Sequence, residues 1–198
     1  MKVCLLSKMF PPITGGSAMY AYKIANSLGD RGHDVDVYTQ SVEEGESTLE
    51  VHDNVSVCKL TKSRRYLVTF ETLYYSLRAR AGVDLDDYDV IHGTLMPSSM
   101  IALGDRVTFD TPIVLTSHSF ALSAIRYHTP EKPADYLLKY VFHPMNAAMD
   151  VITARRADRV IAISESMERK LVEKYRLSAD RVTTITHGVD TEHFRPIS

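Results

Sequence analysis

Short apolar runs alternate along the whole chain with stretches of helical periodicity. Runs with the length and the β-branched content of buried strands lie at residues 3–6, 35–38, 55–60, 90–92, 113–116, within 157–166 and at 182–185. Most of the segments between them are long enough for a helix that crosses from one parallel strand to the next. The pattern therefore predicts an α/β fold, a doubly wound and mainly parallel sheet of about seven strands with helices on both faces.

Three helices have clear sequence signals. The first begins at Ser17 and repeats small apolar residues on one face. A long helical pattern runs from Ala134 to about Ala157, and Pro144 inside it predicts a kink or break. Ser164 is a predicted N-cap, with Met167 at the third helical position after it. A further helix start is expected at 97–99, and residues 120–133 lack periodicity, which suggests a loop over the ligand-binding edge of the sheet.

Charge and cysteine usage narrow the class of protein. The formal net charge is −2, so no overall positive field favours nucleic acid as a partner. Cys4 and Cys58 both lie in predicted buried strands and form no CxxC pair, which indicates a reduced compartment. The apolar run before Ser7 has only four residues, and no run approaches the roughly 20 residues that span a bilayer. We therefore expect a cytoplasmic protein.

The turn between the first strand and the first helix is a candidate anion site. Gly15 and Gly16 precede Ser17, and glycines let a ligand approach backbone N–H groups at a helix start. The spacing is not GxGxxG, which argues against an NAD or FAD site. There is also no P-loop lysine, which argues against an ATPase. Taken alone, a glycine pair is also compatible with a purely structural turn.

Polar residues follow several other predicted strands, and the carboxyl ends of parallel strands meet at the edge where ligands bind. The candidates for lining a cleft there are His92, Gly93, Thr94, Ser117, His118, Ser164 and Glu165. A single histidine is more often structural than functional. A strand end in the ligand cleft favours a hydrogen-bonding role for His118, as an anchor for a substrate hydroxyl.

Two other clusters invite a functional interpretation. Asp84, Asp86 and Asp87 imitate a metal-binding Asp-x-Asp motif, but they precede a strand and so lie at the opposite edge of the sheet. We expect no metal and no cofactor. Residues 64–80 form an aromatic helix with basic ends, which fits either packing on the sheet or peripheral contact with anionic lipid at the inner membrane face.

Six motifs in order resemble glycosyltransferase family 4, from residue 2 to about 196. They are PPITGG (11–16), LGDRGHDVDVYT (28–39), DVIHG (89–93), VLTSHS (114–119), ADRVIAISES (157–166) and THGVDTEHFRP (186–196). Members of this family are retaining, nucleotide-sugar-dependent enzymes of the GT-B architecture, in which two Rossmann-like domains flank the active site. The resemblance implies that 1–185 is the N-terminal, acceptor-side domain and that 186–198 begins the interdomain linker.

The resemblance also implies roles for individual residues. Gly15, Gly16 and the adjoining Ser17 match the glycine loop that approaches the donor's phosphates and sugar, and His118 matches a catalytic histidine that contacts the transferred sugar. The second domain normally supplies a basic pair and a Glu-x7-Glu motif for the donor, and the resemblance implies that this chain does not contain that domain. The implied partners are a nucleotide-sugar donor, an acceptor that is a sugar, lipid-linked or a small polyol, and the absent C-terminal donor-binding domain. We expect the chain alone to bind donor weakly and to turn over little.

Two alternatives remain open at this point. The chain fits a stand-alone, non-catalytic binding module that pairs with a separate donor-binding subunit. It also fits another Rossmann-type enzyme that acts on a phosphate-containing ligand.

Overall fold

The computed structural model describes residues 1–13, 15–41, 49–62, 68–94, 110–120, 122, 123, 125, 129–189 and 191. The helix expected to start at 97–99 lies outside these residues, as does part of the loop expected at 120–133. The basic residues Arg64 and Arg65 also lie outside them.

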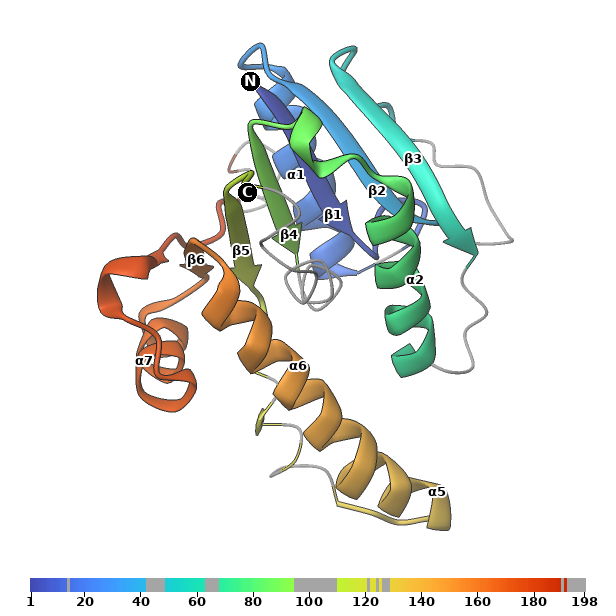
Figure 1. Ribbon diagram of the computed structural model, residues 1–198, viewed down its shortest axis with the longest axis vertical. Helices are drawn as coiled ribbons and strands as arrows, with labels where there is room; N and C mark the ends of the chain where they lie inside the picture. The colour runs from blue at the N-terminus through green and yellow to red at the C-terminus, as the bar shows by residue number, and fades with distance from the viewer. Residues whose placement is uncertain are drawn as a thin grey trace, which may run out of the picture.

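A parallel seven-stranded sheet forms the centre of the molecule, with strand order β3-β2-β1-β4-β5-β6-β7 (Figure 1). The strands are β1 (Lys2–Ser7), β2 (Asp34–Ser41), β3 (Val55–Lys62), β4 (Val90–Thr94), β5 (Ile113–Ser117), β6 (Arg159–Ala162) and β7 (Val182–Thr184). The chain runs outward from β1 to β3, returns to β4 beside β1, and then runs outward in the other direction. This order confirms the predicted doubly wound α/β fold, and it places the switch point of the topology between β1 and β4.

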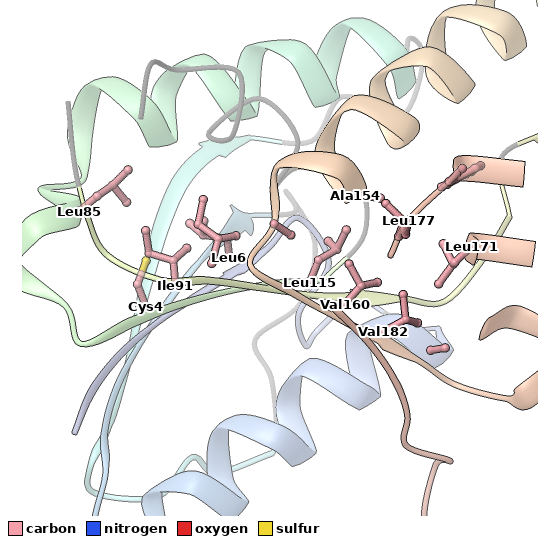
Figure 2. Packing of buried hydrophobic residues seen from close by; sticks show 14 of the residues in the cluster. Cys4, Leu6, Leu85, Ile91, Leu115, Ala154, Val160, Leu171, Leu177 and Val182 are labelled. Atoms are coloured by element: carbon pink, nitrogen blue, oxygen red, sulfur yellow. The ribbon is translucent and has the colours of Figure 1, made fainter. Parts of the chain in front are cut away.

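Helices cover both faces of the sheet. They are α1 (Gly16–Gly29), α2 (Val68–Gly82), α5 (Pro133–Leu137), α6 (His143–Arg156) and α7 (Glu165–Tyr175), with short helical turns η1 (Leu85–Asp87), η2 (Leu138–Phe142) and η3 (Ala179–Arg181). Figure 2 shows α1 on one side of the sheet and α2 and α6 on the other.

Alternate residues of β1 supply the two hydrophobic cores. Cys4 and Leu6 face a large cluster that includes the labelled side chains of β4, β5, β6 and α7 in Figure 2. Val3 and Leu5 face a smaller cluster with Ala21 and Ala25 of α1. Successive side chains of a strand point to opposite faces, so the one central strand contributes to both cores.

The long helical pattern is interrupted where Pro144 predicts a break. Residues 138–142 form a π-helical turn, and the His143 N–H donates to the Leu138 carbonyl, five residues earlier. Pro144 then occupies the first turn of α6, where its missing N–H is tolerated. The α-helical hydrogen-bond pattern thus changes just before Pro144, while the backbone stays helical at Leu137, Phe142 and His143. In Figure 1, α5 and the start of α6 extend beyond the carboxyl ends of the strands.

The two cysteines differ in environment. Cys4 is buried, as expected, but Cys58 is exposed, so the prediction that both are core residues is wrong for Cys58. It lies on β3, which is an edge strand of the sheet formed by the described residues. Among the described residues, none of the helices combines the length and the apolar composition needed to cross a bilayer.

Candidate functional site

A cavity of about 890 Å³ opens at the carboxyl edge of the sheet. It lies between one face of α1, from Gly16 to Ser27, the residues that follow β5 and β6, and the segment 185–189 after β7. Because the carboxyl ends of parallel strands are where doubly wound folds bind ligands, this cavity is the candidate active site.

The N-terminus of α1 opens into this cavity. Gly15 caps the helix with φ 145° and ψ 159°, a conformation that L side chains rarely adopt, and it offers no side-chain hydrogen bond to the first turn. Gly16 and Ser17 line the cavity, and a Cβ built on Gly16 would meet no atom within 4 Å. The backbone N–H groups of a first helical turn have no partner within the helix, so this turn can bind an anion.

Helix α1 has two distinct faces. Ala18, Ala21 and Ala25 are buried against the sheet, as the sequence predicts. Tyr20 and Lys23 line the cavity from the other face, together with Gly16, Ile24 and Ser27. This second face was not among the predicted site residues, although Gly16, Tyr20, Lys23 and Ser27 follow one another at steps of three or four residues in the sequence. Lys23 places a cation at the rim.

His118 follows β5 and lines the same cavity. Its Nε2 is buried and has no hydrogen-bond partner in the structure. Burial, and next the charge of His187, lower the pKa of His118 from 6.5 to about 4. The imidazole is therefore neutral at pH 7 and can donate or accept a hydrogen bond without carrying charge.

Three aromatic rings meet at His118. The Tyr20 ring lies 4.4 Å from the His118 ring and 4.9 Å from the His187 ring, measured between centroids, and meets both at steep angles. The two imidazoles are nearly parallel, with centroids 5.3 Å apart. Tyr20 and His187 were not among the predicted site residues. His187 belongs to the THGVD motif, which the family resemblance implies is the start of the interdomain linker.

A hydrogen-bonded chain connects Tyr20 to the interior of the sheet. The Tyr20 hydroxyl lies 3.0 Å from Oγ1 of Thr116, which in turn lies 2.8 Å from Nε2 of His92. His92 is buried in β4 and does not line the cavity. Its burial, and next the charge of His118, lower its pKa to about 4.

The remaining predicted cleft residues lie outside the lining of the cavity. Gly93 and Thr94 are buried in β4, where the Thr94 hydroxyl donates to Oγ of Ser7 at 2.8 Å. Ser117 is buried, and its hydroxyl donates to the Ser119 carbonyl at 3.3 Å.

Ser164 and Glu165 begin α7. Oγ of Ser164 accepts from the Met167 N–H at 3.2 Å, which confirms the predicted N-cap, and Glu165 is exposed in the first turn. A contact of these cleft candidates with an acceptor stays a prediction.

In the aspartate cluster, the Asp84 side chain caps a helical turn. Asp84 accepts a hydrogen bond from the Asp86 N–H at 3.3 Å and caps η1, at the amino edge of the sheet. Within the described ranges, no three His, Cys, Asp or Glu side chains lie close enough together to hold a metal ion.

Known proteins with similar sequences are sugar transferases. The chain is 30% identical over 195 residues to the D-inositol 3-phosphate glycosyltransferase of Thermomonospora curvata, an alignment that covers 92% of this chain and 43% of that protein. It is 27% identical to the mannosylfructose-phosphate synthase of Agrobacterium fabrum, covering 95% of this chain and 44% of that protein. The chain thus spans less than half the length of these relatives.

Solved structures share the fold. Sucrose-phosphate synthase from Thermosynechococcus elongatus superposes with a TM-score of 0.75 at 18% identity, over 99% of this chain and 50% of that chain. Anabaena HepE, in complex with UDP-glucose, superposes with a TM-score of 0.62 at 20% identity, over 97% of this chain and 45% of that one. The sheet order and these neighbours together show a Rossmann-like fold.

The family model for glycosyltransferase family 4 matches residues 14–193. That range contains the open N-terminus of α1, His118 and the THGVD segment that together build the cavity. The chain belongs to glycosyltransferase family 4.

Proposed function

We propose that this chain is the acceptor-side domain of a retaining glycosyltransferase that transfers a sugar from a nucleotide-sugar donor to an acceptor. The observation that supports this most strongly is the cavity, which is lined both by a helix N-terminus without a side-chain cap and by the neutral His118. A donor of this class has a diphosphate and a sugar, which match these two parts of the site.

The charges of the cavity fit a diphosphate leaving group. In our proposal the N–H groups of Gly16 and Ser17 face the donor's phosphates, and Lys23 adds a positive charge at the rim. Negative charge grows on the diphosphate as the sugar departs, so a positive helix end aimed at it lowers the barrier. His118 donates or accepts a hydrogen bond at a sugar hydroxyl.

A second domain belongs to this proposal. The relatives are more than twice as long as the aligned part, and the HepE structure is described as a complex with UDP-glucose. We propose that residues 1–185 form one wall of the site and that 186–198 lead to a donor-binding domain. The chain alone should then bind a nucleotide sugar weakly.

Titration of the chain with UDP-glucose, followed by amide chemical shifts, tests the anion site. We expect shifts at the N-terminus of α1 and at His118. Gly16→Asp should weaken binding by about tenfold or more, because a carboxylate there repels phosphate. The loss would not come from a destabilised helix, because acidic residues stabilise the first turn of a helix. Ser166→Asp is the matched control, since Ser166 is exposed in the first turn of α7 and does not line the cavity.

Two results would contradict the proposal. One is equal loss of affinity in both variants. The other is tighter binding of NAD than of UDP-glucose, which would favour a different Rossmann-type enzyme.

Two observations favour different acceptors. The name of the Thermomonospora relative specifies an inositol phosphate, which supports a small polyol acceptor for this chain. Tyr74 and Leu77 of α2 are 57% and 55% exposed, beside the exposed Arg78, which supports contact between residues 64–80 and a lipid surface. Such contact would place the protein at the inner membrane face and favour a lipid-linked acceptor.

A further inference from the structure

We propose that Tyr20 and His187 are positioning residues that hold the His118 ring in one orientation against the cavity. This inference rests on the proposed function for its biological meaning. The effect of the two neighbouring rings on the orientation and protonation of His118 can be tested without any sugar transfer.

The three rings form a compact group from three separate segments. Tyr20 comes from α1, His118 follows β5 and His187 follows β7. The Tyr20 ring contacts both imidazoles at interplanar angles of 75° and 61°. The imidazoles differ by only 14° in orientation. Buried Nε2 of His118 has no hydrogen-bond partner among the described residues, and ring contacts with Tyr20 and His187 are the interactions that orient this side chain.

A hydrogen bond on the side of the sheet holds the Tyr20 side chain in place. Its hydroxyl bonds to Thr116, and Thr116 bonds to the buried His92, so the chain of contacts ends in the interior of the sheet. Thr116 is fully buried, and neither it nor His92 lines the cavity. Tyr20 thus links the His118 ring to the buried interior of the sheet.

The surroundings of His118 disfavour its protonation. Burial is the larger cause and the charge of His187 the second, and Lys23 also lines the cavity. Tyr20 stays neutral, since burial raises its pKa above 10. Among the described residues that line the cavity, none is acidic. A proton on buried Nε2 would also lack an acceptor.

Imidazole nitrogen shifts of the chain, recorded against pH, test the proposal directly. We expect wild-type His118 to stay neutral down to about pH 4. His187→Gln removes one ring and its charge, and Tyr20→Leu removes the other ring. Each should raise the His118 pKa by about one pH unit or more, toward 6.5, and change its tautomer populations.

Three controls separate positioning from general destabilisation. Tyr20→Phe keeps the ring and should move the His118 pKa less than Tyr20→Leu does. Tyr22→Phe alters a tyrosine of the same helix whose hydroxyl donates to the Glu50 carbonyl, and should leave His118 unchanged. His187 is exposed, so its variant can be made without disturbing the core if Tyr20→Leu fails to fold.

The outcomes are distinct. An unchanged His118 titration in His187→Gln would overturn the proposal, as would a wild-type His118 that titrates near pH 6.5. If the pKa shifts occur but UDP-glucose does not bind, the ring contacts are established and the proposed function fails instead.

Discussion

His92 shows how burial can turn a candidate ligand into a structural residue. The sequence places it at a strand end, but the structure buries it and bonds its Nε2 to Thr116. An imidazole in this position must remain neutral, because a buried cation would lack compensating charge. Its pKa near 4 in the folded state compares with about 6.5 in an unfolded chain.

This difference predicts acid sensitivity of the fold. Between pH 6.5 and pH 4 the unfolded chain binds a proton at His92 and the folded chain does not, so stability is full above pH 6.5 and falls as the pH drops. The contribution of His92 is on the order of 2 to 3 kcal/mol between pH 7.5 and 4.5. Urea unfolding at both pH values should show a smaller loss in His92→Gln than in the wild type. Equal losses in the two proteins would refute this role.

At the scale of single elements, the start of α7 separates a structural role from a functional one. Ser164 has extended backbone angles, φ −161° and ψ 158°, and its hydroxyl oxygen accepts from the Met167 N–H. These are the features of an N-cap. The adjoining residue that lines the cavity is Ile163, not Ser164.

Replacement of this cap should therefore affect stability and not ligand binding. Ser164→Ala is expected to lower the free energy of unfolding by about 1 kcal/mol, and Ser164→Asp should restore most of it. Ser166→Ala, in the same turn but without the capping bond, is the control. Thermal unfolding and UDP-glucose titration measure the two effects. A loss of UDP-glucose binding with unchanged stability would instead assign Ser164 to the site.

At the scale of the whole molecule, the order of the strands decides which residues meet. The first helix and the segment after the last strand border one cavity, although about 170 residues separate Gly16 from His187. The opposite face carries α2 and α6, with Tyr74 and Leu77 of α2 exposed. These surfaces lie on different parts of the molecule, so membrane contact through α2 would leave the cavity accessible.

Vesicle binding tests this placement. If residues 64–80 contact anionic lipid, the chain should sediment with phosphatidylglycerol vesicles, and Arg64→Gln with Arg65→Gln should weaken binding by about 30-fold, at about 1 kcal/mol per arginine. The matched control is Arg169→Gln with Lys170→Gln on α7. Similar binding by both double variants, or no binding by the wild type, would leave the small polyol as the favoured acceptor.

The sequence alone determined the class of fold and the position of most elements. Apolar runs and helical periodicity identified the seven strands, the buried alanine face of α1, the irregularity of the helix at Pro144 and the cap at Ser164. These features depend on neighbours within a few residues, which a sequence displays directly. The family resemblance followed from the same local motifs.

Only the tertiary structure decided which side chains share the site. It buried His92 and Thr94, exposed Cys58 on the edge strand, and brought Tyr20, His118 and His187 together. The sequence shows where each of these residues lies relative to the nearest helix or strand. It does not show which of them the strand order and the two faces of the sheet bring close together. Such contacts depend on the packing of segments that are distant along the chain, and no local pattern encodes them.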